Sequence, residues 1–390
     1  MRTIKLAFYS SMLNHHQVRI ADELYKKLGQ GFRFIEIDEI IDNKGSIDDY
    51  SKRPYLIRVV DSEENYKQAI KIATTAEVCV FSGICSLPYE QERLKHNLLS
   101  FDMDERPLKR GLINILSKTN LKTIVYYWLK RWYSKPLYKL CCSAFTKSDY
   151  SRLHMFKGKC YKWGYFTKVD EIFDLEALIE NSTKEILPIM WCGRFLIWKH
   201  PEIPILIAAK MKAKGYKFQI AMYGGEGGAA RWDKVYHSTK LQSMINKLDV
   251  ADCVMLMGNR ANEDILRAMR ESAIFLFTSD RMEGWGAVAN ESMANACVLV
   301  ASDEIGSTPY LINNGNNGFI AKSCNVDSFV EKVEWLLVHP QEMKKMQRNA
   351  YIEMRSLWSP KHAVESLLSL MENLKQGYDT SIIEGPCSKA

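Results

Sequence analysis

The sequence lacks the features that mark several large classes of protein. Its ten cysteines among 390 residues are too few for a disulfide scaffold, and none are spaced as Cys-x-x-Cys. No run of eighteen apolar residues occurs that could span a membrane, and Lys5 interrupts the short apolar stretch near the N-terminus. The eight histidines are scattered, which argues against a zinc site. We therefore expect a protein of the reducing cytoplasm, without a signal peptide.

The composition is that of an ordinary globular protein. Hydrophobic residues make up 47% of the chain and charged residues 25%, which excludes wholesale disorder and collagen-like or coiled-coil chains. At about 150 residues per domain, the length predicts two domains, each with its own core. The net charge of +7 is mild and does not by itself indicate a nucleic-acid partner.

Short apolar runs alternate with segments of helical periodicity along the whole chain. Strand candidates of the N-terminal half lie at 4–9, 32–37 and 78–81, and those of the C-terminal half at 186–192, 218–223, 254–257, 274–278 and 298–301. Strand–helix–strand units of this spacing require right-handed crossovers and parallel sheets. We therefore predict the α/β class, with two Rossmann-like doubly wound domains facing a central cleft that holds the ligand.

The domain boundaries follow from where this alternation stops. We place an N-terminal domain at 1–170, an acidic interdomain linker at 171–184 and a C-terminal domain at 185–358. A helix at 359–376 is predicted to pack back on the N-terminal domain. The tail at 377–390 has no periodicity and is expected to be loose.

The segment at 281–301, RMEGWGAVANESMANACVLVA, follows the strand AIFLFTS and carries the strongest functional signal. A strand, a glycine loop and a helix start present free backbone N–H groups and the positive end of a helix dipole, which suits a phosphate. The loop residues in question are Glu283, Gly284, Gly286, Ala287 and Val288. Glu291, eight residues after Glu283, can face the same ligand, so the two carboxylates suit a ribose and a hexose at the ends of a diphosphate. A simple turn is the alternative.

A second informative segment, GRFLIWK at 193–199, also follows a strand. Gly193 lets the backbone turn, while Arg194 and Lys199 place two cations where they can neutralise a diphosphate leaving group. Glycine turns at Gly224 and Gly258 line the same edge of the sheet. Ordinary solvated charge is the alternative interpretation of the two cations.

Together these segments resemble the family 4 retaining glycosyltransferases, which have the two-Rossmann-domain fold called GT-B. The matching stretches are GRFLIWK at 193–199, MYGGEG at 222–227, MLMGNRANEDI at 255–265, the residues 277–301 and NNGNNGFIA at 313–321. They cover most of the C-terminal half in the family's order. Two features depart from the family: the first loop, SSMLNHHQ, has no glycine, and Tyr310 follows Pro309 where many members have Glu.

The resemblance implies a role for each residue. Arg194 and Lys199 would hold the phosphates of a UDP- or GDP-sugar, Glu283 the transferred sugar and Glu291 the ribose hydroxyls. The sugar would keep its anomeric configuration through front-face attack, with no metal or other cofactor, and catalysis would be mainly electrostatic. The N-terminal domain would bind the acceptor. SSMLNHHQ and ERPLKRG at 105–111 resemble a subgroup from bacterial capsular and exopolysaccharide clusters, which implies a glycan or lipid-linked acceptor in polysaccharide biosynthesis.

His15 and His16 are expected at the cleft, where one of them, His16 slightly favoured, could bond the acceptor hydroxyl or the donor sugar; helix capping or solvation is the alternative. The Asp102-Met103-Asp104 triplet resembles the metal motif of the GT-A fold, but we interpret it as structural or incidental.

The stretch at 106–148 contains ten Lys or Arg and no Asp or Glu. Six Tyr or Trp residues are interleaved with these cations: Tyr126, Tyr127, Trp128, Trp132, Tyr133 and Tyr138. Such a mixture suits an anionic membrane surface, where each cation adds about 1 kcal/mol, so a peripheral location at the inner face of the cell membrane is expected. Single-stranded nucleic acid, or a solvated helix over an aromatic core, would fit the same composition.

The sequence is also compatible with two other functions. A nucleotide-sugar epimerase on the same architecture would turn over the donor without an acceptor. A nucleic-acid-binding protein would bind oligonucleotides with a steep dependence on salt, although no nucleic-acid partner follows from the glycosyltransferase resemblance. A dehydrogenase is disfavoured, because no Gly-x-Gly-x-x-Gly opens the first strand–helix turn.

Overall fold

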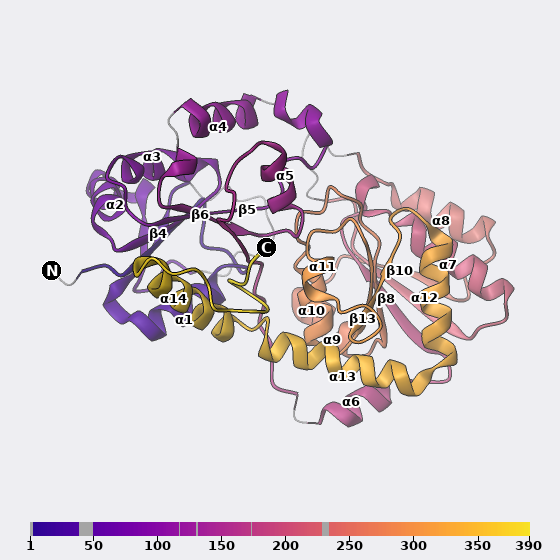
Figure 1. Cartoon of the computed structure of the whole chain (residues 1–390). Coiled ribbons are helices and arrows are strands. Elements are labelled where there is room, and N and C mark those ends of the chain that lie inside the picture. Colours follow the sequence, from indigo (N-terminus) through magenta and orange to yellow (C-terminus); the bar gives the residue numbers. More distant parts are fainter. Residues whose placement is uncertain (1–2, 39–49, 117, 130–131, 173, 228–233) are drawn as a thin grey trace. The chain divides into compact units, whose positions relative to one another are not determined.

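The computed structural model describes the chain except for residues 1–2, 39–49, 117, 130–131, 173 and 228–233. It divides into two compact units, residues 1–167 with 357–390, and residues 168–356. Each unit is a parallel sheet covered by helices (Figure 1). This confirms the predicted α/β class with two doubly wound, Rossmann-like domains.

The N-terminal unit contains a seven-stranded sheet of order β3-β2-β1-β4-β5-β6-β7. Its strands are β1 (Leu6–Ser10), β2 (Phe32–Glu36), β3 (Leu56–Arg58), β4 (Val78–Ser82), β5 (Ser100–Asp104), β6 (Leu137–Cys141) and β7 (Cys160–Lys162). Its α-helices are α1 (Val18–Leu28), α2 (Glu63–Thr75), α3 (Leu87–Lys95), α4 (Lys118–Leu129), α5 (Thr146–Arg152) and α14 (Pro360–Lys375). Helix α14 lies beside α1, where Lys27 and Glu365 form an ion pair (Figure 1).

The C-terminal unit contains a six-stranded sheet of order β10-β9-β8-β11-β12-β13. Its strands are β8 (Leu187–Cys192), β9 (Phe218–Tyr223), β10 (Val254–Gly258), β11 (Ile274–Phe277), β12 (Val298–Ser302) and β13 (Gly318–Ala321). Its helices are α6 (Leu175–Ser182), α7 (Glu202–Ala213), α8 (Ser238–Lys247), α9 (Asn262–Arg270), α10 (Val288–Ala294), α11 (Thr308–Leu311), α12 (Val326–Val338) and α13 (Pro340–Ser356).

The central strands are buried on both faces, which explains why they are continuous apolar runs. Every residue of β11 and β12 is buried, and Ile274 pairs in register with Val298. Helices cover both faces, so alternation between apolar and polar side chains has no physical basis in these strands. The eight predicted strands coincide with β1, β2, β4 and β8 to β12, whereas β3, β5, β6, β7 and β13 were not predicted.

The prediction of a loose C-terminal tail is wrong. Cys387 and Ser388 are buried, and the backbone of Lys162 in β7 donates to Ser388 O (2.8 Å) and accepts from Cys387 N (2.7 Å). β7 is an edge strand, and its outer N–H and C=O groups need partners. The last residues of the chain supply these partners, although they carry no periodic signal.

The predicted linker also differs from a plain connection. It holds helix α6, whose Ile179 packs with Tyr351 of α13 and with Ala296 in a small apolar cluster of the C-terminal unit. The helix has only eight residues, so its apolar spacing is too brief to be recognised in the sequence.

Candidate active site

In the C-terminal unit the strand order reverses between β8 and β11. The chain runs outward from β8 through β9 to β10, and then returns to place β11 on the other side of β8. The loops that follow β8 and β11 therefore leave the sheet in opposite directions and open a crevice beyond the strand ends. In open α/β sheets such crevices bind ligands.

Two predicted site residues meet at this crevice. Lys199, in the loop after β8, places its Nζ 2.5 Å from Oε2 of Glu283, in the loop after β11. The Ser279 hydroxyl donates to the same carboxylate oxygen at 3.0 Å. The Lys199 and Glu283 side chains are only 13% and 11% exposed, so solvent screens this ion pair little. The crevice thus holds a fixed cation beside a fixed hydrogen-bond acceptor.

Hydrogen bonds across the crevice fix the loop that carries Lys199. The indole N–H of Trp191, in β8, donates to the hydroxyl of Thr278 at 2.9 Å. That hydroxyl in turn donates to the backbone carbonyl of Lys199 at 2.8 Å. The cation is consequently positioned by the two strands themselves.

His200 is a second cation at this place, and sequence reasoning missed it. Burial would lower the pKa of its imidazole, but hydrogen bonds from its ring nitrogens to Asp280 and Glu202 raise the pKa to about 10. His200 is therefore charged at neutral pH, directly after Lys199. No local sequence signal distinguishes it, because Asp280 is eighty residues away in the chain.

Backbone hydrogen bonds connect the three glycine turns that follow β8, β9 and β10. Gly193 N donates to Tyr223 O (3.0 Å), and Gly224 N donates to Gly258 O (3.0 Å). A Cβ at Gly224 would lie 1.9 Å from Gly193 O, and its φ is +129°. Only glycine allows this approach of two loops. Arg194 is exposed on the first of these turns.

The loop at 283–288 leads into α10 as the sequence predicts. Gly286 has φ +81°, and a Cβ there would lie 2.2 Å from the Phe277 ring, so the loop packs against the end of β11. The backbone N–H groups of Ala289 and Glu291 donate to the carbonyls of Gly286 and Ala287. The backbone N–H groups before Ala289 come too early in the chain to take part in the hydrogen bonds within the helix. The backbone amides of Gly286, Ala287 and Val288, predicted to bind a phosphate, lie there, and Gly284 in the same loop is buried.

Glu291 lies on α10 near the end of β8. Burial raises the pKa of its carboxyl to about 7. Burial and the charge of Glu291 raise the pKa of the Cys192 thiol, at the end of β8, to about 12. The Glu291 carboxylate therefore lies close to that strand end. The structure thus brings Glu291 to the same edge of the sheet as Lys199 and Glu283.

In the N-terminal unit the strand order reverses between β1 and β4, and His16 lies there. It lines a pocket of about 270 Å³ with Asn14, Ser82 and Tyr165. Its ring stacks on Tyr165 at 5.3 Å and touches the His15 ring at 3.7 Å. Burial and the neighbouring His15 lower the pKa of His16 to about 4, so it is neutral at pH 7.

The basic stretch at 106–148 is in part a buried structural network, which corrects the sequence interpretation. Arg106 forms a buried bidentate ion pair with Asp149, both distances being 3.2 Å. Lys139 is fully buried and binds Asp102 at 2.5 Å and Asp104 at 2.9 Å. Of the aromatic residues, Tyr127 and Trp132 belong to the core, whereas Trp128 is exposed.

Comparisons with known proteins agree with this geometry. Residues 174–353 match the family model described as glycosyl transferases group 1. A segment of 182 residues is 28% identical to the trehalose synthase of Pyrococcus horikoshii, and it covers 47% of this chain and 43% of that protein, less than half of its length.

Solved structures resemble the chain over nearly its whole length. HepE of Anabaena, solved with UDP, is similar over 94% of this chain and 99% of its own, with TM-score 0.66 and 13% identity. A glycosyltransferase from Rickettsia africae is similar over 96% and 100%, with TM-score 0.66 and 16% identity. The sucrose-phosphate synthase of Thermosynechococcus elongatus is similar over 95% and 99%, with TM-score 0.66 and 14% identity. The chain therefore has the GT-B fold of these structures, and residues 174–353, in the C-terminal unit, are similar to the glycosyl transferases group 1 family.

Proposed function

We propose that the chain is a retaining glycosyltransferase that uses a nucleotide-diphosphate sugar and needs no metal. The observation that carries this proposal is the Lys199–Glu283 pair at the point where the strand order reverses, with Glu291 at the same edge. HepE, which has the same fold, was solved with UDP and with UDP-glucose, and this supports a donor of that class. The acceptor is a glycan or a lipid-linked saccharide in cell-surface polysaccharide synthesis.

The reaction breaks the bond between the anomeric carbon and the diphosphate oxygen. The acceptor hydroxyl attacks from the same face, and its proton goes to the departing diphosphate. Negative charge grows on that diphosphate, where Lys199, Arg194, His200 and the amides before α10 can stabilise it. Glu283 accepts hydrogen bonds from the transferred sugar. Fixed cations thus supply the charge that a divalent ion supplies in other transferases.

Nucleotide binding should depend on the ionisation of Glu291, because ribose hydroxyls donate to a carboxylate. Its raised pKa of about 7 predicts that the Kd for UDP or GDP falls as the pH rises from 5.5 to 7.5. The fall should approach roughly tenfold per unit at the acidic end and level off above pH 8. Calorimetric titrations of the wild type and Glu291→Gln at each pH measure this effect. The nucleotide's own phosphate titrates with both proteins, so the difference between the two pH profiles reports Glu291 alone.

Folding provides an independent check on the same group. A carboxyl pKa raised above its unfolded value lowers the free energy of unfolding as pH rises from about 4.5 to 7, by up to about 3 kcal/mol. Glu291→Gln should therefore unfold at a higher temperature than the wild type at pH 8 and at a similar temperature at pH 4.5. Parallel pH profiles for the two proteins, in binding and in unfolding, would contradict the assignment.

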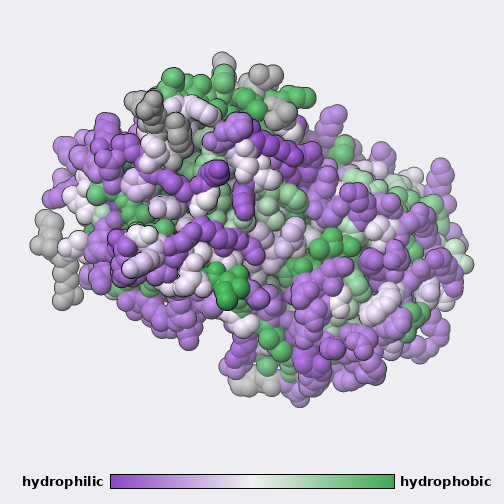
Figure 2. All heavy atoms as spheres, in the orientation of Figure 1, coloured by the Kyte–Doolittle hydropathy of each residue, from purple (hydrophilic) through white to green (hydrophobic). Residues whose placement is uncertain are grey.

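We further propose that the protein binds an anionic membrane surface through α4. Leu121, Val125 and Trp128 recur along one exposed face of this helix, with Leu129 beside them, and Figure 2 shows apolar surface gathered there. Within the described part of the chain, no helix has the length and apolar character needed to cross a bilayer. The contact we propose is therefore peripheral, with apolar side chains entering the headgroup region.

Removing these side chains should weaken membrane binding. We expect Trp128→Ala combined with Leu129→Ser to lower recovery with anionic liposomes in flotation by roughly tenfold. Ile352→Ser is the matched control, because Ile352 is 50% exposed on α13, in the other unit. Equal recovery of wild type and double variant, or equal recovery on neutral vesicles, would contradict the membrane assignment.

A further inference from the structure

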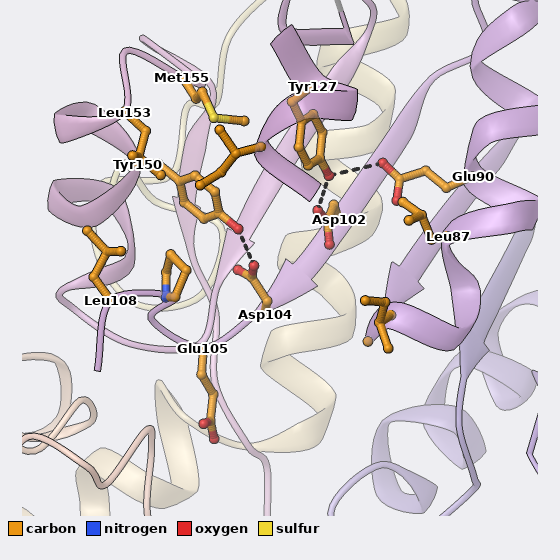
Figure 3. A pocket seen from close by; sticks show the side chains of 14 residues that line it. Leu87, Glu90, Asp102, Asp104, Glu105, Leu108, Tyr127, Tyr150, Leu153 and Met155 are labelled. Carbon is orange, nitrogen blue, oxygen red and sulfur yellow. Dashed lines mark hydrogen bonds between the residues drawn. The ribbon is translucent and has the colours of Figure 1, made fainter. Parts of the chain in front are cut away.

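The N-terminal unit contains a second pocket, separate from the crevice of the C-terminal unit. It has a volume of about 230 Å³ and opens at the carboxyl ends of β4 and β5 (Figure 3). It continues into the pocket beside His16, because Gly83, Asp104 and Glu105 line both. The two pockets together offer room for more than one saccharide ring.

The lining of this pocket combines two chemically distinct groups of residues. Seven of them are apolar: Ile84, Leu87, Pro107, Leu108, Ile124, Leu153 and Met155. Six are polar: the carboxyl-bearing Glu90, Asp102, Asp104 and Glu105, and the hydroxyl-bearing Tyr127 and Tyr150. Among the described residues, no Lys, Arg or His lines it. The lining is therefore rich in hydrogen-bond acceptors, although two lysines outside it bind these carboxylates: Lys139 binds Asp102 and Asp104, and Lys109 binds Glu105 at 2.5 Å.

A buried network holds the two aspartates in place. Lys139 pairs in register with Asp102 across β5 and β6, and its ammonium binds both Asp102 and Asp104 from beneath. The hydroxyl of Tyr127 donates to Asp102 at 2.5 Å, and that of Tyr150 donates to Asp104. Within the described ranges, no three His, Cys, Asp or Glu side chains gather so that they could hold a metal ion. Both aspartates of the Asp-x-Asp triplet thus take part in this buried network.

Hydrogen-bonding capacity remains unused around the pocket. Oδ1 of Asp104 is buried and accepts no hydrogen bond within the described structure, and Nδ1 of His16 is in the same state in the adjoining pocket. Burial and the charge of Asp102 raise the pKa of Glu90 well above its usual value. Hydrogen-bond acceptors and apolar side chains are together the complement of a sugar ring, which has hydroxyls at its rim and C–H groups on its faces.

We propose that this pocket holds an uncharged saccharide end of the acceptor, with Asp104 and Glu105 accepting its hydroxyl hydrogens, and that it rejects acceptors with an anionic group there. This proposal rests on the proposed transferase function, because only a transferase has an acceptor substrate for the pocket to bind. The pocket's selection of uncharged over anionic sugars does not depend on a donor. An acceptor carrying uronic acid or phosphate at this end would face the carboxylate oxygens directly, because the lysines that bind them do not line the pocket.

The test measures binding to the full chain without any nucleotide. The probes are p-nitrophenyl glycosides of glucose, galactose and N-acetylglucosamine, compared with p-nitrophenyl glucuronide, which differs from the glucoside only in its carboxylate. We expect saturable binding of at least one neutral glycoside by saturation-transfer NMR, and at least about tenfold weaker binding of the glucuronide. Glu105→Gln and Asp104→Asn should each weaken the neutral glycoside and reduce the discrimination against the glucuronide.

Two controls keep the outcome interpretable. Glu105 is on the rim and its side chain is 28% exposed, so Glu105→Gln preserves folding even if Asp104→Asn disturbs the Lys139 network. Asp252→Asn, at an exposed position of the other unit, should leave glycoside binding unchanged. Glucuronide binding as tight as that of the glucoside, no binding of any neutral glycoside, or a Glu105→Gln variant identical to the wild type would overturn the proposal. Failure of the donor proposal would appear separately, as absent UDP and GDP binding.

Discussion

Replacing Lys199 with methionine should lower the rate of sugar transfer by roughly a thousandfold, with a smaller loss in nucleotide affinity. Lys199 is the best-fixed cation in the crevice, since the Trp191–Thr278–Lys199 chain of hydrogen bonds holds its backbone. Charge on the leaving diphosphate is larger in the transition state than in the bound donor, so the loss falls mainly on kcat. Steady-state kinetics and UDP titration measure the two effects.

A double-variant cycle separates two roles of this lysine. If Lys199 acts only by orienting Glu283, Lys199→Met/Glu283→Gln should be no slower than Glu283→Gln alone. If it also stabilises the leaving group, the double variant should be slower than either single one. Lys212→Met, the same change at a half-buried position of α7 that is remote from the crevice and forms ion pairs with Asp249 and Asp252, controls for loss of charge. A Lys199→Met enzyme within a few-fold of wild type would refute the role of the pair.

Replacing Gly224 with alanine should abolish nucleotide binding and lower the free energy of unfolding by about 3 kcal/mol or more. The added Cβ would lie 1.9 Å from the backbone oxygen of Gly193, and no side-chain rotation relieves a clash between two backbones. The loops after β8 and β9 must then separate, which displaces Arg194 and Lys199 from the crevice. Thermal unfolding and UDP titration report the two effects.

Gly215→Ala is the matched control for this prediction. Gly215 also has a positive φ, +79°, but a Cβ there would meet nothing within 4 Å. Its variant suffers the strain of the left-handed conformation alone, about 1 kcal/mol, and should bind UDP normally. If the two variants lose the same stability and bind UDP equally well, Gly224 is not required for the close approach of the two loops.

The parts of the fold that were predictable are those with a continuous physical signal. Buried parallel strands must be apolar along their length, so runs such as 218–223 and 274–278 coincide with β9 and β11 to within a residue. Strand ends carry glycine and polar residues, and parallel strands end at one edge. That is why Lys199 and Glu283, eighty-four residues apart, could be expected near each other before the structure was known.

Other features could not be predicted because their partners are distant in the sequence. The ten cations at 106–148 look like a basic surface when they are counted, yet Arg106 pairs with Asp149 and Lys139 with the Asp-x-Asp of the neighbouring strand. The charge of His200 depends on Asp280. The tail lacks periodicity because it follows the edge of β7 rather than forming an element of its own.

The most direct measurement is a transfer reaction with UDP- and GDP-sugars and neutral p-nitrophenyl glycoside acceptors, in the presence of a metal chelator, with the products followed by NMR. We predict a new glycosidic bond whose anomeric configuration equals that of the donor, formed by the wild type and lost in Lys199→Met. An inverted linkage, a strict requirement for a divalent ion, or conversion of the nucleotide sugar to its epimer without any acceptor would contradict the account.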